Sequence, residues 1–205
     1  MPECPAGIAE SIGGVENGLP RSIHAGTYMN KDVIQISRAL DFAARKHVSQ
    51  RRKGIAQEPY INHLAEVALL LAEATDGEDT GLVIAGLLHD CIEDQGVRAE
   101  DLVELFGKDV ASLVQDVTDD KSLPKPERKQ LQVDHTPRKS DRAKMLKIAD
   151  KTANLRALVD SPPHDWEPER KREYFAWAKN VVAGCRGVNA FLEAKFDESY
   201  RRGVL

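Results

Sequence analysis

The chain has 205 residues, of which 41% are hydrophobic and 30% are charged, and its formal net charge is -4 at pH 7. This length and composition predict one globular domain with a sizeable buried core, and they exclude a disordered or fibrous chain. The negative charge argues against a nucleic-acid binder that works through bulk electrostatics, although a local basic pocket can still hold a small anion.

Residues 1–29 carry glycines and prolines without sustained periodicity, and they are predicted to form a flexible tail. From Lys31 onward, apolar residues recur at three- and four-residue spacing. This spacing predicts a helix up to His47 with Asn30 as its cap. A basic polar segment, residues 49–54, is expected to end the helix and to lead into a loop.

The remaining elements are also predicted to be helical. A second helix is expected over residues 60–73, and a third follows the breaker at 76–79 and runs to Gly96. Two short helices separated by Gly107 are expected over residues 99–105 and 108–116, and a lid-like basic connection follows over residues 121–138. An apolar helix over residues 142–158 ends at two prolines, and a long C-terminal helix spans residues 168–200 with a kink near Gly184 and Gly187. No stretch alternates with period two for long, so we expect an all-α, compact, single-domain fold over residues 30–205.

The three cysteines, Cys4, Cys91 and Cys185, are far apart and contain no CxxC pair, so they predict neither a disulfide framework nor a thiolate zinc site. The N-terminus lacks a basic segment followed by an apolar stretch, and the longest apolar run, residues 67–72, is too short to cross a bilayer. We therefore expect a cytoplasmic protein without a membrane partner. The oligomeric state is left open.

The most informative segment lies at the end of the third predicted helix, where charge should be costly. It places one histidine and three carboxylates within six consecutive residues: His89, Asp90, Glu93 and Asp94. At roughly 100° per residue, these four lie on the side of a helix opposite to the apolar residues among them. Imidazole nitrogens together with carboxylate oxygens suit borderline divalent metals such as manganese, iron, cobalt or zinc. His89 and Asp90 are therefore candidate metal ligands whose shell other elements must complete.

Two distant residues, His63 and Asp150, are candidates to complete that shell. Taken alone, His63 is more simply explained as a packed histidine that forms hydrogen bonds. Asp150 lies in an apolar helix, where it would cost several kcal/mol unless it is paired or bound to metal. A salt bridge to Lys147 or Lys151 explains it as well as ligation does. Asn154, one turn further, shares its face and can orient a substrate.

Glu93 and Asp94 follow the first two candidate ligands by one turn and lie near the open positions of such a shell. Carboxylates placed there can take a proton from water or return one to a leaving oxygen. The alternative is a helix C-terminus with surface acids. The helix dipole disfavours acids at that end, so a cationic group is expected beside them.

Basic residues cluster before and after these candidates. They are Arg51, Arg52 and Lys53, then Lys121, Lys125, Arg128 and Lys129, and then Lys144 and Lys147. Each cluster alone is more simply explained as a solvated face. Their repeated proximity to the candidate ligands favours a polyanion, because lysine and arginine recognise phosphate through charge-assisted hydrogen bonds. A nucleobase can stack on Arg52 or on an aromatic residue such as Tyr174.

In this order, the motifs resemble those of HD-superfamily hydrolases and, within them, of the hydrolase domain of RelA/SpoT alarmone enzymes. The resemblance covers nearly all of the chain except its N-terminal tail. It rests on Gln50-Arg51-Arg52-Lys53, Pro59-Tyr60-Ile61-Asn62-His63, Leu87-Leu88-His89-Asp90 with Glu93-Asp94, Ala149-Asp150-Lys151, Asn154-Leu155-Arg156 and Glu173-Tyr174-Phe175. The chain departs from the pattern at Cys91, Gln95 and Lys151, and Gln95 can alter the support of Asp94.

The resemblance implies an HD-domain fold and a role for each candidate residue. The implied ligands of one divalent ion, usually Mn²⁺, are His63, His89, Asp90 and Asp150. The implied catalytic pair is Glu93 and Asp94. The implied contacts of a guanosine nucleotide are Arg52 and Lys53 on its guanine side, with Lys125, Asn154 and Tyr174 along its pocket.

The implied activity is metal-dependent hydrolysis of the 3′-pyrophosphate of (p)ppGpp, which gives GDP or GTP plus pyrophosphate. The family's synthetase domain has no counterpart in the sequence, so we expect the protein to degrade alarmones and not to make them. Two alternatives stay open: an NADPH 2′-phosphatase, and a nucleotide-binding sensor without turnover. The intact acidic pair argues against the sensor.

Overall fold

Helices account for the regular structure of residues 25–204, the part of the chain that the computed structural model describes. In chain order they are α1 (Ala25–Lys46), α2 (Ile61–Ala74), α3 (Thr80–Leu88), α4 (Cys91–Gln95), α5 (Ala99–Val117), α6 (Lys125–His135), a 3-10 turn (Thr136–Arg138), α7 (Asp141–Asp160), α8 (Pro168–Ala183) and α9 (Ala190–Val204). Within these residues the only β-type pairing is one bridge between Arg51 and Pro59. The all-α prediction is confirmed.

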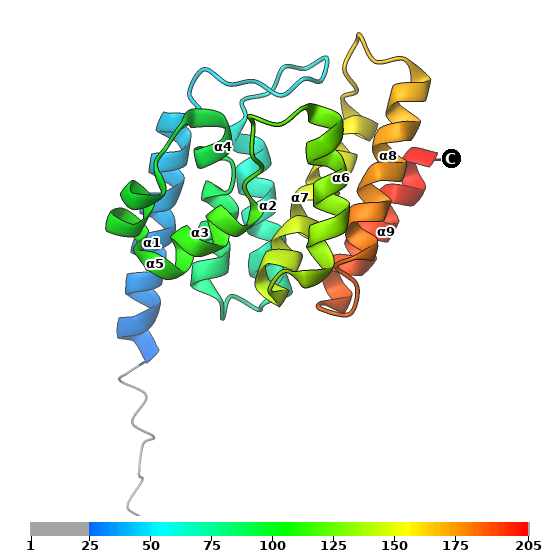
Figure 1. The fold of residues 1–205 in the computed structure, drawn as a ribbon. Helices are drawn as coiled ribbons and strands as arrows, with labels where there is room; N and C mark the ends of the chain where they lie inside the picture. Colours follow the sequence, from blue (N-terminus) through cyan, green and yellow to red (C-terminus); the bar gives the residue numbers. More distant parts are fainter. Residues whose placement is uncertain (1–24, 205) are drawn as a thin grey trace, which may run out of the picture.

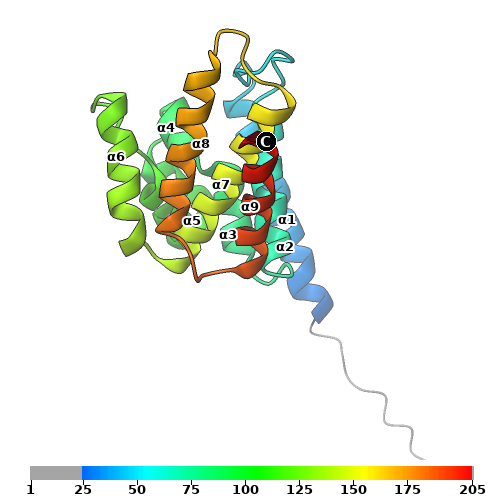
Figure 2. The ribbon, with the colours of Figure 1, turned by 90° about the vertical axis from the view of Figure 1, so that its right-hand side faces the viewer.

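The helices α2, α3 and α7 form the centre of the bundle. Figure 1 shows α1 and α5 on one side of them and α8 and α9 on the other. The second view shows α6 standing apart beside α8 (Figure 2). Every residue of α3 from Leu82 to Leu88 is buried, which explains why its sequence is apolar on all sides. The site described below therefore sits on elements that are held by the core.

The first helix begins earlier than the sequence predicts, at Ala25 and not at Lys31. Its N-terminal part extends away from the other helices in Figure 1. The residues around Val33 and Ile34 are exposed. Apolar periodicity reports burial, and residues 25–30 show no such periodicity in the sequence, so it did not predict this start. Of the predicted tail, residues 1–24 lie outside the described residues.

The third predicted helix is not continuous. It ends at Leu88, and a separate short helix begins at Cys91. Between them Asp90 has φ -98° and ψ 0°, near the bridge region of the backbone map. The prediction of one continuous helix up to Gly96 is therefore wrong. The side chains of His89 and Asp90 still approach each other, because Nε2 of His89 lies 3.1 Å from Oδ2 of Asp90.

Other boundaries follow the glycines. The predicted break at Gly107 is confirmed, because its φ of 86° and ψ of 163° interrupt α5. The kink predicted near Gly184 and Gly187 in the helix over residues 168–200 is a full break, because α8 ends at Ala183 and α9 begins at Ala190. The Asn189 side chain accepts a hydrogen bond from the backbone N–H of Leu192 and so caps α9.

None of the described helices is both long enough and apolar enough to span a membrane.

Candidate metal centre and substrate pocket

Three distant segments of the chain bring nitrogen and oxygen ligands together. His63 lies in the first turn of α2, the His89-Asp90 pair links α3 to α4, and Asp150 lies midway along α7. The Nε2 atom of His63 is 3.4 Å from Oδ1 of Asp150, and Nε2 of His89 is 3.1 Å from Oδ2 of Asp90. The Nε2 atom of His63 is also 3.8 Å from Oδ2 of Asp90, and Nε2 of His89 is 3.8 Å from Oδ1 of Asp150. Each histidine nitrogen therefore lies within 3.8 Å of an oxygen of both candidate carboxylates, and His63, His89 and Asp90 place ligand atoms within 4.8 Å of one another.

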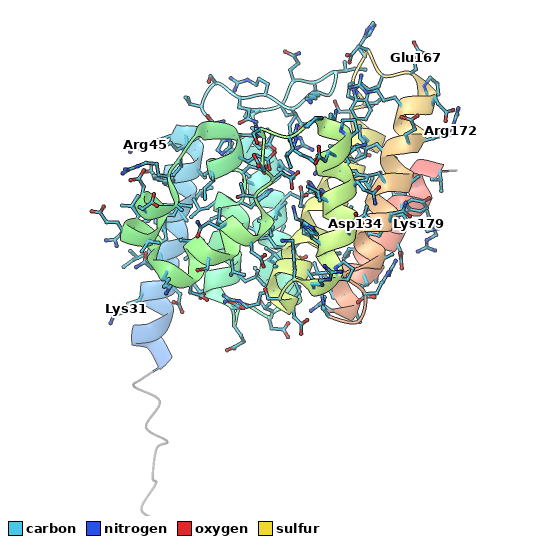
Figure 3. The ribbon with its side chains drawn as sticks, in the orientation of Figure 1. Lys31, Arg45, Asp134, Glu167, Arg172 and Lys179 are labelled. Atoms are coloured by element: carbon cyan, nitrogen blue, oxygen red, sulfur yellow. The ribbon has the colours of Figure 1, made fainter. Side chains whose placement is uncertain are left out.

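Burial separates these residues from the ordinary charged residues of the chain. The charged side chains labelled in Figure 3 are all exposed: Lys31, Arg45, Asp134, Glu167, Arg172 and Lys179. Exposed charges of this kind are solvated and need no partner. His63, His89 and Asp150 are exposed by only 3%, 5% and 8%. Groups of this kind need a compensating partner inside the protein.

The two histidines offer free lone pairs to that point. The Nδ1 atom of His89 is 2.8 Å from the carbonyl oxygen of Gly86, to which it donates, so its Nε2 atom is left as an acceptor. Among the described residues, Nε2 of His89 and both ring nitrogens of His63 have no hydrogen-bond partner. Ligands at about 2.1 Å from a common centre lie roughly 3 to 4 Å apart. The donor set therefore fits a divalent metal ion.

The electrostatics of the centre also favour a positive charge. Burial alone would lower the pKa of His89, but the carboxylates of Asp90 and Asp150 outweigh it and raise that pKa to about 9. Burial lowers the pKa of His63, and the nearby Arg52 acts in the same direction. The protonated form is thus favoured at His89 and disfavoured at His63. A cation shared between the two carboxylates supplies the same compensation without protonating either ring.

A further layer of hydrogen bonds orients the two carboxylates. The Tyr60 hydroxyl donates to Oδ2 of Asp90 at 2.6 Å. Lys151 donates to Oδ2 of Asp150 at 2.9 Å, and the Asn154 amide donates to Oδ1 of the same carboxylate at 2.6 Å. Asp150 thus forms the salt bridge to Lys151 and also faces the histidines, so the two readings of this residue are not exclusive. Such outer contacts fix the direction in which each carboxylate points.

Sequence reasoning assigned no role to Tyr60. Its position three residues before His63, one helical turn away, was the available signal. Lys147 is the other lysine that the sequence offers as a partner of Asp150. Its ammonium group instead donates to the backbone oxygen of Val117 at 2.7 Å. Burial lowers the pKa of Lys147.

Glu93 and Asp94 lie one turn beyond the centre, on α4. The Glu93 carboxylate accepts a hydrogen bond from the backbone N–H of Asp119 at 3.2 Å and lies 3.7 Å from Arg128. Burial and, after it, the charge of Asp119 raise the pKa of Glu93. Asp94 accepts hydrogen bonds from Gln50 at 2.7 Å and from Lys121. Arg128 and Lys121 are the cationic groups that the helix dipole argument predicts beside these acids.

A cavity of about 950 Å³ opens over the centre. His63, Glu93 and Asp94 line one part of it. All five residues predicted to contact substrate also line it: Arg52, Lys53, Lys125, Asn154 and Tyr174. Burial and neighbouring cations lower the pKa of Lys125 and of Lys129. Crowded cations in a cavity are stabilised by a polyanionic ligand, which satisfies several of them at once.

Three features of the cavity wall were not predicted. Tyr174 stands between two tryptophans, with ring centroids 5.7 Å from Trp166 and 5.2 Å from Trp177. The Trp177 indole donates to the backbone oxygen of Lys129 at 3.0 Å, which ties α6 to α8. Arg52 donates to Asn154 at 3.0 Å, so its guanidinium is anchored toward the metal centre. The cavity therefore offers aromatic faces as well as cations to a nucleotide.

Gly54 is the contact by which the basic loop docks onto the end of α7. A Cβ atom at this position would lie 2.1 Å from the backbone oxygen of Ser161. The neighbouring Ile55 N–H donates to the oxygen of Pro162 at 3.2 Å. Gly54→Ala is expected to displace the loop that carries Arg52 and Lys53. The kcat/KM for the expected nucleotide hydrolysis should then fall by about 10- to 100-fold, because a displacement near 1 Å is costly to catalysis.

The measurement for this prediction is steady-state kinetics beside thermal unfolding. Ile55→Ala is the matched control, because the Ile55 side chain is 66% exposed and its backbone hydrogen bond remains. The control is expected to keep the kcat/KM of the unaltered protein. Wild-type kinetics in Gly54→Ala would show that loop docking does not place these cations.

Comparison with known proteins agrees with this geometry. The HD domain family model matches residues 39–177. The guanosine-3′,5′-bis(diphosphate) 3′-pyrophosphohydrolase MESH1 of Drosophila melanogaster is 49% identical over 167 residues, which cover 81% of this chain and 93% of that protein. The human MESH1 is 44% identical over 174 residues, with 85% and 97% coverage. The solved structure of a metazoan orthologue of SpoT that hydrolyses ppGpp matches with a TM-score of 0.79 and 48% identity over 83% of this chain and 97% of that chain.

Proposed function

Because this chain belongs to the HD domain family, we propose that it hydrolyses guanosine-3′,5′-bis(diphosphate) at the 3′ position and releases pyrophosphate. The products are GDP from ppGpp and GTP from pppGpp. The observation that carries the proposal is the position of the His63, His89, Asp90 and Asp150 donor set beside a cavity with several cations. The names of relatives that align over most of their length support the same reaction.

The proposed ligands of one divalent ion are His63, His89, Asp90 and Asp150. Members of the family that act as hydrolases use a divalent metal, and the mixed nitrogen and oxygen donors favour a borderline ion. We propose Mn²⁺ as that ion. When bound, it polarises a phosphoryl oxygen and makes a neighbouring water more acidic. Tyr60 and Lys151 keep the two carboxylates in place for it.

The proton transfers are proposed to fall to Glu93 and Asp94. Cleavage of the bond between the 3′ oxygen and phosphorus needs one proton removed from water and one delivered to the departing ribose oxygen. Both carboxylates line the same cavity, so one can accept the first proton while the other supplies the second. Lys125, Lys129 and Arg128 line the cavity beside them and stabilise the negative charge that develops on the phosphates.

The pocket residues Arg52, Lys53, Asn154 and Tyr174 are proposed to bind the nucleoside part of the substrate. The guanidinium of Arg52 lies 5.6 Å from the centroid of the Tyr60 ring and is held by Asn154, so it presents a fixed planar cation to a base.

The two described cysteines, Cys91 and Cys185, are free and buried. Free thiols suit a reducing compartment, and we propose the cytoplasm as the site of action.

The experiment is to incubate manganese-loaded protein with ppGpp or with NADPH and to measure the released phosphorus species. Pyrophosphate and GDP in equimolar amounts are the expected result. Orthophosphate from NADPH, without pyrophosphate from ppGpp, would overturn the proposal in favour of a 2′-phosphatase. Saturable nucleotide binding without either product would indicate a sensor. Removal of the metal with a chelator should stop the reaction, and added Mn²⁺ should restore it.

A further inference from the structure

Gln50 connects the active-site carboxylate of Asp94 to a buried histidine. Its amide nitrogen donates to Oδ2 of Asp94 at 2.7 Å. Its amide oxygen lies 2.6 Å from Nδ1 of His47 on the other side. Gln50 belongs to the segment after α1, whereas Asp94 belongs to α4, so this amide joins two elements at the edge of the cavity.

The contacts of the amide oxygen determine which way the amide faces. Besides His47, the side-chain nitrogen of Gln95 donates to the same oxygen of Gln50. An oxygen that accepts from two donors leaves the NH₂ group on the opposite side, toward the carboxylate. A carboxylate only accepts hydrogen bonds, so the arrangement is satisfied in this orientation and not in the flipped one.

His47 is itself held in place from several sides. It is 2% exposed, and its ring stacks on that of Tyr60 with centroids 5.2 Å apart and planes 14° apart. The buried thiol of Cys91 lies 3.6 Å from its Nε2 atom. With Nε2 facing a thiol donor, Nδ1 carries the ring proton and donates it to Gln50. Hydrogen bonds thus run in one direction from Cys91 through His47 and Gln50 to Asp94.

The other partner of Asp94 cannot fix it in the same way. Lys121 donates to Oδ1 of Asp94, but the lysine side chain is 47% exposed. Exposed ion pairs contribute little, because water screens the charges and the side chain loses entropy on pairing. Lys121 is also free to turn toward an incoming phosphate. The part-buried Gln50 is therefore the partner that holds Asp94 in one orientation throughout the reaction.

We propose that Gln50 is a positioning residue for Asp94, held from behind by His47 and Gln95. The inference rests on the proposed function, in which Asp94 transfers a proton. Cys91 and Gln95, at which the chain departs from the motif it resembles, both contact His47. The positions that differ from the motif therefore lie in direct contact with this histidine.

The test is the kinetics of Gln50→Met, which keeps the length of the side chain and removes the amide. The kcat is expected to fall by about 10- to 100-fold, the usual cost of losing an outer hydrogen-bond partner. The KM and the bound metal should remain unchanged, because Asp94 is not a proposed ligand. Gln115→Met is the control, since Gln115 is exposed on α5, and it should keep the original kcat. An unchanged kcat in Gln50→Met would overturn the inference.

A second pair of variants separates positioning from general destabilisation. His47→Phe keeps a ring against Tyr60 but removes the donor to Gln50, whereas His47→Asn removes the ring and places an amide N–H near the position of Nδ1. We expect His47→Phe to lose kcat as Gln50→Met does, and His47→Asn to recover most of it. The reverse order would show that packing, and not the hydrogen bond, is what matters.

Asp94→Ala distinguishes failure of this inference from failure of the proposed function. If Gln50 acts through Asp94, then Gln50→Met should cause no further loss when it is combined with Asp94→Ala. Full activity of Asp94→Ala alone would refute the proton role assigned to Asp94. Low activity of Asp94→Ala together with an additive effect of Gln50→Met would leave that role intact and overturn the positioning role.

Discussion

Asp150→Asn is expected to remove the bound divalent ion and the hydrolytic activity together. Asp150 Oδ1 lies 3.4 Å from His63 and 3.8 Å from His89, and its other oxygen binds Lys151. An amide keeps the size of the side chain but loses the anionic oxygen that a cation requires. Loss of several kcal/mol of metal assistance corresponds to a rate reduction on the order of 10³-fold, at about 1.4 kcal/mol per tenfold.

Metal content by elemental analysis and kcat/KM should fall in parallel in this variant. Asp141→Asn is the control on the same helix, because the Asp141 side chain is 81% exposed. The change also deprives the buried Lys151 of its partner, so the free energy of unfolding must be measured beside activity. His63→Gln leaves the pair of Asp150 and Lys151 intact and should lose metal equally. Stoichiometric metal and full turnover in Asp150→Asn would show that the proposed ligand set is wrong.

Leu71→Ala is expected to give a large loss of stability without touching the site. Leu71 is 0% exposed on α2, and its Cδ1 atom lies 2.8 Å from the position of a Cβ built on Gly86. Removing a buried leucine costs transfer free energy and leaves a cavity, which together amount to about 2–5 kcal/mol. Chemical denaturation should therefore show a much lower free energy of unfolding, with an unchanged m-value.

Leu69→Ala is the matched control, since Leu69 lies two residues away on the same helix and is 58% exposed. Its effect should stay within roughly 0.5 kcal/mol. Gly86→Ala should destabilise the otherwise unaltered chain, but it should partly fill the space left by Leu71→Ala. The double mutant is then more stable than the sum of the single effects predicts. Strict additivity would show that α2 and α3 do not pack through this contact.

The helical architecture could be predicted because apolar spacing and helix breakers act locally. Gly107 interrupts α5 where the sequence predicts it, at a φ of 86°. Where packing decides, prediction was wrong. The segment from Thr80 to Asp94 contains a break that its residue types do not indicate. Local propensity is a weak prior beside tertiary contacts.

The set of candidate site residues could also be predicted, because burying an ionisable group beside apolar helix residues costs free energy unless the group is paired or bound to a metal. Two of their partners could not. Tyr60 and Gln50 donate to carboxylates that lie 30 and 44 residues further along the chain, and a hydrogen bond between such segments depends on distances of a few tenths of an ångström. No spacing rule within one helix encodes such a contact.

The sequence by itself determined the class of fold, and it predicted the chemical types of the candidate site residues and an anionic ligand, because each of these depends on composition and local spacing. Only the tertiary structure decided that the Nε2 atoms of His63 and His89 lie within 3.8 Å of oxygens of both Asp90 and Asp150, and that Gln50 turns its amide nitrogen toward Asp94. These outcomes depend on how α2, α3, α4 and α7 pack, and packing is a property of the whole core.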